Sequence, residues 1–466
     1  MRTVSRALAV LMVAVAGCAF NPDATPADRA STPDAIGGRT PAPGRAADAK
    51  PMAVISPRPA GATELQPLPA RPARCALPPE GRDDLRASDV ATAWRTLWVD
   101  RARGSIDLLA VAADGALWAT FWTERQRGTS LETRDGGVRR RDGGAWRTFE
   151  IPPLPDRGAP SVVALAAASA DKAWAIGNSS GRKGGDTIGF IGTYERGRWR
   201  SEALAKPAAD TIGWGFTAAR SAGADRAWTV NGRVGLLWTG REWQHYRLPG
   251  EAGALSSQGE QVWAVTGGRG GQPAAMRWEQ VGREQVGREQ VGREQVGWRL
   301  IGVPVLETPD HEVSGSVLRD VGVIGPDDVW VVGGVSWLME HEYDDEGEPL
   351  ERGRPVALHW DGRSWTCHWG PPGSSVGRPA WRITTFGQAE LDGRGGLWVL
   401  GRGDLLWHLS EGRWTRHRIP APAGYVAQVN SLALRPGTGQ VYAAGSVTSK
   451  KENPFAVSHA ALWRAG

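Results

Sequence analysis

Charged side chains inside short, otherwise apolar segments are the first candidates for chemistry in this sequence. They are Asp107, Arg319, Asp320 and Arg382. A pair of carboxyl groups in a recessed site can cleave a glycosidic bond, with one acting as general acid and the other as base or nucleophile. Charged groups gathered in a central pocket can equally hold water there. These residues are therefore candidates for a central polar pocket, with no catalytic role assigned to any of them.

Three aromatic residues are candidates for direct ligand contact, because they fall outside the regular aromatic pattern described below. They are Trp214, Trp381 and Tyr425. Trp381 precedes Trp398 by 17 residues and Tyr425 precedes Tyr442 by 17 residues, so both should occupy equivalent places in their repeats. Exposed aromatic faces suit sugar rings or peptide side chains. The alternative is that these rings pack beneath loops.

Motifs for several other chemistries are missing. The sequence contains no His-Glu-x-x-His, no Gly-x-Ser-x-Gly, no phosphate-binding loop and no Cys-x-x-Cys. Residues Glu340 to Glu351 include seven carboxylates, and carboxylate oxygens are good ligands for Ca²⁺. Their spacing does not match a calcium-binding loop, however. We therefore expect a solvated acidic segment, no metal site and no cofactor.

The N-terminal segment has the features of a bacterial secretory signal peptide, residues 1–17. A short basic start is followed by the apolar run from Ala7 to Ala16. The stretch Val15-Ala-Gly-Cys18 resembles a lipobox, which implies that Cys18 carries a thioether-linked diacylglycerol and starts the mature protein. Acyl chains of this kind hold a soluble domain on a lipid bilayer. The alternative is an ordinary cleaved signal with a chance cysteine.

Residues 18–86 are expected to form a disordered linker. They are rich in Ala, Pro, Asp, Gly and Thr, and Phe20 is their only aromatic residue, so they can bury little apolar area. Besides Cys18 the chain has Cys75 and Cys367. In an oxidising compartment these two can form a disulfide that pins the linker to the outer edge of the fifth repeat. They can also stay reduced, since the sequence does not give their distance.

A short pattern recurs seven times in the rest of the chain: a turn, then an aromatic residue, then two apolar or small residues. The aromatic residues are Trp118, Trp174, Trp228, Trp263, Trp330, Trp398 and Tyr442. A second pattern, an aromatic residue and a Trp separated by four turn-forming residues, follows most copies, as from Trp360 to Trp365. Short alternating runs joined by glycine-containing turns are typical of β-hairpins.

Each repeat is therefore interpreted as four β-strands. In the second repeat they are residues 162–168, 172–177, 189–195 and 198–204. Repeated four-stranded sheets predict an all-β fold, a seven-bladed β-propeller of antiparallel blades at residues 87–466. The small residues of the innermost strands suit the crowded axis. Trp residues suit the wider gaps between blades farther out.

Two departures from the repeat support this interpretation. The last repeat lacks a fourth strand, and residues 93–98 repeat the Ala-Trp-Arg-Thr of the fourth strand at 145–149. An N-terminal strand should thus complete the last blade and leave no free sheet edge there. Residues 280–297 contain three copies of Arg-Glu-Gln-Val-Gly, whose removal restores the usual spacing between Trp278 and Trp298. We predict an expanded hairpin turn.

Two stretches carry a family resemblance. Asp327-Asp-Val-Trp-Val-Val-Gly333 and His359-Trp-Asp-Gly-Arg-Ser-Trp365 resemble the Trp-rich propeller repeats of bacterial secreted proteins and lipoproteins. The resemblance covers residues 87–466 and implies the β-propeller fold. Propellers of this type serve binding, scaffolding and sometimes catalysis. The Gly-His and Trp-Asp pairs of WD40 repeats are missing, so the partners of that family are not implied.

The distribution of charged residues and the lengths of the loops limit the functions that the sequence allows. The 55 basic and 50 acidic residues are spread along the chain, which does not indicate nucleic-acid binding. Long segments at 123–138, 178–187, 336–355 and 446–457 should open on one face, and long loops often bind ligands. We expect a monomeric, lipid-anchored protein of the bacterial cell envelope, with its folded domain outside the cytoplasm, whose loop face binds a protein or glycan. The alternatives are a glycan-cleaving enzyme that uses inner-strand carboxylates and an envelope assembly scaffold.

Overall fold

The residues that the computed structural model describes lie between Lys50 and Gly466. The described residues are 54–55, 58–59, 64–68, 74–79, 89–90, 94–127, 130–142, 144–181, 187–204, 218–266, 273–281, 284–286, 289–291, 295–310, 313–343, 347, 349–374, 384–401, 403–450 and 457–466. The predicted signal peptide, Cys18, Trp214, Trp381 and Arg382 lie outside them. Among the described residues, no helix has the length and apolar character needed to cross a membrane.

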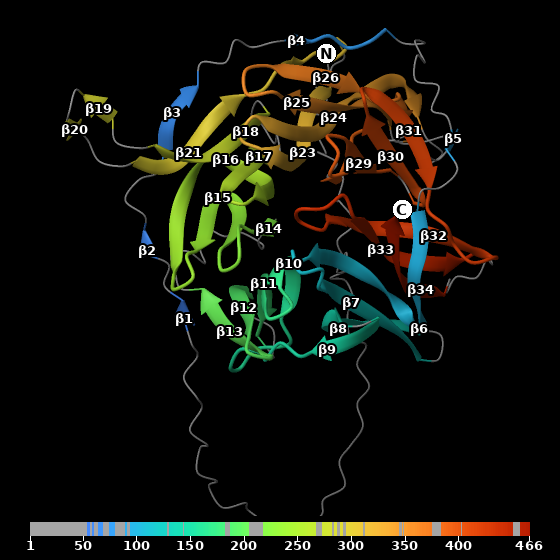
Figure 1. The fold of residues 1–466 in the computed structure, drawn as a ribbon. Coiled ribbons are helices and arrows are strands. Elements are labelled where there is room, and N and C mark those ends of the chain that lie inside the picture. Colours follow the sequence, from blue (N-terminus) through green and yellow to red (C-terminus); the bar gives the residue numbers. More distant parts are fainter. Residues whose placement is uncertain are drawn as a thin grey trace, which may run out of the picture. The chain divides into compact units, whose positions relative to one another are not determined.

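The described chain is an all-β β-propeller built from four-stranded antiparallel blades. One blade contains β10 (Ser161–Ser169), β11 (Lys172–Ser180), β12 (Thr187–Glu195) and β13 (Arg198–Leu204), paired in that order. Each strand begins and ends within three residues of its predicted bounds. Figure 1 shows further sheets of the same kind following one another along the sequence.

The other antiparallel groups repeat this arrangement. They are β6 (Trp94–Val111), β7 (Leu117–Arg127), β8 (Ser130–Asp142) and β9 (Ala145–Phe149); β14 (Ala218–Ser221), β15 (Ala227–Trp238) and β16 (Trp243–Gln258); β16, β17 (Gln261–Thr266), β18 (Ala274–Val281) and β21 (Gln295–Gly302); β23 (Ser314–Gly325), β24 (Asp328–Tyr343), β25 (Pro349–Trp360) and β26 (Trp365–Trp369); β28 (Ala389–Leu391), β29 (Leu397–Leu400), β30 (Leu405–Ser410) and β31 (Arg413–Arg418); and β32 (Tyr425–Leu434), β33 (Val441–Ser449), β34 (Ser458–Ala465) and β6. Shorter strands are β19 (Glu284–Val286), β20 (Glu289–Val291), β22 (Val305–Leu306) and β27 (Gly373–Ser374).

The two ends of the propeller meet in one sheet. The first half of β6 pairs with β34, with Trp98 opposite Leu462, and the second half pairs with β7, with Ala110 opposite Trp118. The strand near the N-terminus thus takes the fourth position beside β34, as the repeated Ala-Trp-Arg-Thr predicted. The pairing leaves β34 with neighbours on both sides.

The Arg-Glu-Gln-Val-Gly copies form an excursion between two paired strands. Trp278 of β18 lies directly opposite Trp298 of β21, as Trp360 lies opposite Trp365 in another blade. Inside the insert, β19 and β20 pair only with each other. The blade therefore keeps its register despite the added residues.

Glycine is required where the inner strands bulge. Bulges at Val163, Arg319 and Asn430 bring the backbone of the innermost strand close to the second strand. A Cβ on the facing glycine would overlap a carbonyl oxygen in all three blades: Gly177 with Ser161, Gly333 with Val317 and Gly445 with Gln428. This close approach explains why glycine follows the second-strand aromatic residue by three positions in these repeats.

Indole rings fill the gaps between neighbouring blades. Trp118 of β7 is fully buried, and its ring centroid lies 4.7 Å from Tyr194 and 5.8 Å from Trp199 of the next blade. Trp228 similarly lies 5.2 Å from Trp298. The repeated aromatic positions are thus structural, because each packs a second strand against the outer strands of the following blade.

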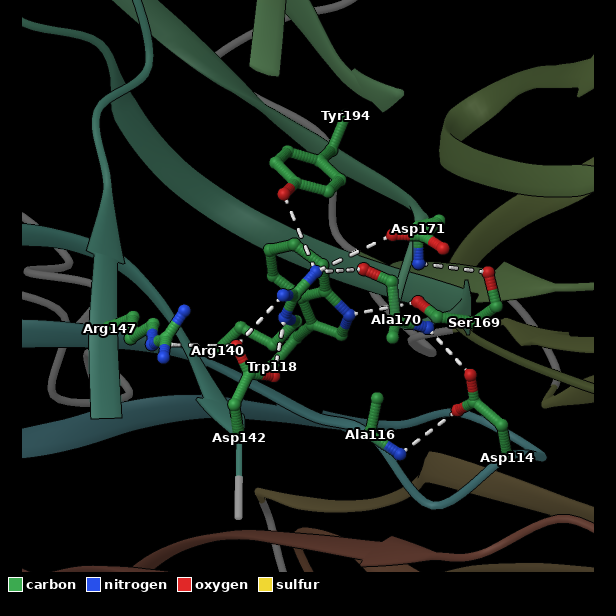
Figure 2. A network of polar contacts seen from close by, with 10 residues as sticks. All are labelled: Asp114, Ala116, Trp118, Arg140, Asp142, Arg147, Ser169, Ala170, Asp171 and Tyr194. Carbon is green, nitrogen blue, oxygen red and sulfur yellow. Dashed lines mark hydrogen bonds and ion pairs between the residues drawn. The ribbon is translucent and has the colours of Figure 1, made fainter. Parts of the chain in front are cut away.

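Polar contacts join the same blades at their hairpin turns (Figure 2). The indole of Trp118 donates to the Ser169 carbonyl over 3.0 Å, and Asp114 accepts from the Ala170 amide over 2.8 Å. Arg140 of β8 donates to the Ala170 carbonyl and binds both oxygens of Asp142, at 2.7 and 2.8 Å. These contacts fix the turn between β6 and β7 against the turn between β10 and β11.

A series of short N-terminal strands lies along the outer edges of the blades (Figure 1). The strands are β1 (Val54–Ile55), β2 (Arg58–Pro59), β3 (Glu64–Leu68), β4 (Arg74–Cys75) and β5 (Asp89–Val90), and they pair in parallel with β13, β16, β21, β22 and β31, respectively. A disulfide joins Cys75 to Cys367 of β26, with Cα atoms 6.0 Å apart. We call these strands the outer belt.

The belt corrects the expected linker boundary. A disordered linker through residue 86 does not agree with the pairing from Val54 onward. The expectation considered only the apolar area that these residues can bury. The outermost strand of a blade offers unpaired backbone N–H and C=O groups, which a passing segment of almost any composition can satisfy.

We predict that Gly333→Ala lowers the free energy of unfolding by about 2 kcal/mol or more, because the new Cβ must displace the Val317 backbone. Gly315→Ala on the neighbouring inner strand β23 is the control, since nothing lies within 4 Å of the Cβ it adds. Chemical denaturation of both variants gives the comparison. Equal stabilities would contradict the bulge explanation.

Candidate functional site

Several polar side chains of the inner strands lie at β-bulges, where the strand shifts register against its neighbour. Asp107 and Arg319, two of the predicted pocket residues, lie where the inner strands shift register, and both are exposed. The Asp107 carboxylate accepts from the Trp122 indole over 2.7 Å. Asn430 occupies the corresponding bulge of β32 and donates to the Ser105 hydroxyl over 2.9 Å. Asn430 was not predicted from the sequence. The signal that could have found it is a polar residue directly before a small residue in an inner strand.

Asp320 links two blades and is not free for chemistry. Its side chain is buried, with 5% of its surface exposed. One carboxylate oxygen accepts from the Val321 amide over 2.9 Å and the other from the Ala389 amide of β28 over 3.0 Å. Burial raises the pKa of Asp320, while Arg220 and the two amides oppose that change. The residue therefore ties β23 to β28.

Arg220 and Glu390 are a charged pair that the sequence search missed. They lie directly opposite the second-strand residues Trp228 and Trp398. The residues at the same position in the other blades are small: Ala110, Ala166, Ser256, Gly322 and Ala433. Alignment of each inner strand against the second-strand aromatic would have identified these two charges as exceptions.

The charges of Asp320, Glu390 and Arg220 interact. The pKa of Glu390 is raised to about 7, because burial and, to a smaller degree, the nearby Asp320 raise it while Arg220 and two backbone amides lower it. The Leu391 amide donates to the Glu390 carboxylate over 3.2 Å. Glu390 therefore exchanges its proton near neutral pH, and it can donate or accept a hydrogen bond there. Asp107 is held instead by Trp122, at a bulge of another strand.

The face at which the second strand of each blade connects to the third is called the loop face. It contains more β-strand than the sequence predicted. Two of its predicted long loops continue as strand pairs, β7 with β8 as far as Arg127 opposite Ser130, and β24 with β25 as far as Tyr343 opposite Pro349. The Tyr343 side chain is 57% exposed. Tyr425, at the start of β32, is half-buried with its ring 6.0 Å from that of His459.

A hollow of about 420 Å³ lies at the turn face, the opposite end of the strands, beside Arg226, Glu260 and Glu279. Its charged side chains bind one another, as shown by Arg226 and Glu260 at 3.1 Å. Arg277 also donates to Glu279 over 2.7 Å. Within the described part of the chain, no group of three or more His, Cys, Asp or Glu side chains is arranged to hold a metal ion.

Comparisons with known proteins concern the fold alone. No protein-family model matches the chain. No curated protein matches it either. Similar solved structures include YCF48 bound to D1 peptide, with a TM-score of 0.40, 13% identity and coverage of 82% of this chain and 97% of that one.

Two further similar structures are enzymes or enzyme-like by their descriptions. The GH93 α-L-arabinofuranosidase of Fusarium graminearum with arabinobiose has a TM-score of 0.37, 9% identity and coverage of 77% of this chain and 92% of that one. The subtype N11 neuraminidase-like protein of A/flat-faced bat/Peru has a TM-score of 0.35, 10% identity and coverage of 78% and 97%. At such identities a shared fold does not carry a shared activity.

We predict that Glu390→Gln removes a pH-dependent loss of stability. The folded pKa of Glu390, about 7, exceeds its ordinary value of 4.5, so the folded state keeps a proton that the unfolded chain loses. This group's stabilisation is complete below pH 4.5 and is lost as the pH rises to about 7. The measurement is the urea midpoint at pH 5 and pH 7.5.

The control for this experiment is the unmodified protein under the same conditions. Histidines such as His417, whose pKa burial lowers to about 4, contribute the opposite slope, so the two proteins must be compared with each other. The variant should gain stability relative to the unmodified protein on going to pH 7.5. Parallel pH profiles would contradict the assignment to Glu390.

Proposed function

We propose that this protein is a lipid-anchored, extracytoplasmic binding protein whose loop face holds a protein or glycan. The membrane attachment rests on the lipobox-like stretch that ends at Cys18 and on the preceding signal-like segment. The proposed location is the bacterial cell envelope, with the propeller outside the cytoplasm as a monomer. A seven-bladed ring is part of this proposal, supported by the seven second-strand aromatic residues and by the two-sheet pairing of β6 and β16.

The observation that carries the proposal is that paired hairpins and an exposed tyrosine lie on the loop face. The β24–β25 hairpin is paired as far as Leu338 opposite Glu351, and after a register shift Tyr343 pairs with Pro349 and is exposed. The β7–β8 hairpin extends in the same direction along the strands. Backbone held by strand pairing loses less conformational entropy on binding than an unpaired loop, and an exposed aromatic ring offers contact area, which favours recognition of a partner.

We expect Tyr343→Ala to weaken ligand binding by about tenfold, because it removes an exposed aromatic ring from this face. We expect the same of Trp381→Ala, since the sequence predicts Trp381 as a ligand contact. Full-length protein is applied to a glycan array and used as bait for envelope proteins, and the affinity of the strongest hit is then measured for both variants. Arg363→Ala is the control, since Arg363 is exposed in the turn between β25 and β26, at the opposite end of the strands.

The outcomes separate the candidates. Loss of a glycan or protein hit in the loop-face variants and not in Arg363→Ala supports the binding function. Envelope proteins that co-purify equally with all variants, without any glycan hit, would contradict it and favour an assembly scaffold.

A glycan-cleaving enzyme remains the second candidate because of one observation. Burial raises the pKa of Glu390 to about 7, the range in which a general acid works near neutral pH. Asp320 is a poor second carboxylate, since both of its oxygens accept backbone amides. Glycan turnover by the unmodified protein that Glu390→Gln abolishes would support this candidate.

A further inference from the structure

A second hollow on the turn face, of about 470 Å³, is lined by three arginines. Arg95 comes from β6, Arg464 from β34, and Arg394 from the turn between β28 and β29. Thr438 and Gln440, in the turn between β32 and β33, also line it, as do Gly393, Gly439, Ala465 and Gly466. Since these turns lie at the ends of the strands opposite to the loop face, the hollow is separate from the proposed binding surface.

Arg464 occupies a position that carries a cation or histidine in several blades. On the third strand, a basic residue lies directly opposite the second-strand aromatic residue in five blades. The pairs are Arg140 and Trp118, Arg277 and Trp263, His359 and Trp330, His408 and Trp398, and Arg464 and Tyr442. In the first four pairs a carboxylate holds the basic side chain: Asp142, Glu279, Asp328 and Asp392. Figure 2 shows the first of them. Within the described residues, no carboxylate forms an ion pair with Arg464.

The neighbours of Arg464 are cations instead. Arg95 is its direct cross-strand partner, and like charges in that arrangement repel. Arg394 adds a third guanidinium from the adjacent blade. The described part of the chain supplies neither Arg95 nor Arg394 with an ion-pairing carboxylate. An anion in the hollow would relieve the repulsion among all three.

Asp392 and Thr438, two other polar residues of this corner, already have hydrogen-bond partners. The Asp392 carboxylate accepts from the Arg394 and Gly396 amides over 2.7 and 2.8 Å, and it pairs with His408 over 2.9 Å. The Thr438 hydroxyl donates to the Arg435 carbonyl over 2.8 Å and accepts from the Gln440 amide over 3.1 Å. The guanidinium groups are the positively charged donors that this hollow offers to a ligand.

We propose that Arg95, Arg394 and Arg464 form a binding site for a phosphate group, either free phosphate or the phosphate of a small monoester. Guanidinium groups match phosphate oxygens with paired, charge-assisted hydrogen bonds. A phosphate carries nearly two negative charges at neutral pH, so it balances three arginines better than one carboxylate does. The 420 Å³ hollow lacks this property, because its Arg226 and Arg277 are each matched by a glutamate.

The test is calorimetric titration of the full-length protein with inorganic phosphate and, separately, with glycerol 3-phosphate. Sodium chloride at matched ionic strength and sodium acetate serve as comparisons. We expect saturable binding of one or both phosphate compounds and none of acetate or chloride. Preference for glycerol 3-phosphate would identify the monoester as the ligand class, and preference for inorganic phosphate would identify the free ion. Equal heats for acetate and both phosphates would overturn the proposal.

Arg464→Gln and Arg95→Gln should each weaken phosphate binding by about tenfold, because each removes a charge-assisted contact. Arg363→Gln is the matched control: it also removes one positive charge, from an exposed turn between β25 and β26. Arg95 is exposed, so its variant carries the test if Arg464→Gln fails to fold. Equal weakening in Arg363→Gln, or unchanged binding in Arg95→Gln, would overturn the proposal.

Discussion

The packing of indole rings between neighbouring blades is the interaction on which the rest of the structure depends. A buried Trp removes roughly 200 Å² from water, which stabilises the fold by about 5 kcal/mol. Trp118 and Trp463 also donate to carbonyls of the adjoining segment, Ser169 and Pro420. Trp174 and Trp263 bury their N–H groups without a described acceptor, at a cost of about 1–3 kcal/mol each. Apolar packing therefore outweighs the unsatisfied donors.

Sheet edges impose the second constraint. The chain covers them with its own N-terminal part: the first half of β6 pairs with β34, and the outer belt pairs with blades farther along. The Cys75–Cys367 disulfide fixes the belt to β26. In the proposed lipoprotein, the chain that follows the anchor pairs with the propeller from Val54 and not from near residue 87.

The second-strand Trp residues and the hairpin spacing allowed the strands to be predicted, because side-chain periodicity and turn chemistry are local signals. The belt escaped prediction because backbone pairing leaves no mark in composition. Arg220 and Glu390 were missed because their importance comes from alignment between blades and from charges brought together by folding. Asp320 was found, but its two backbone partners, one on another strand, could not be inferred from sequence.

Both candidate sites depend on blades held at fixed positions, since the phosphate site takes arginines from β34, β6 and the β28–β29 turn. Hydrogen–deuterium exchange of the full-length protein tests the closure of that framework most directly. The account predicts that amides of residues 94–99 and 460–465 exchange together and as slowly as those of β11. Fast exchange at 94–99 while β11 stays protected would contradict it.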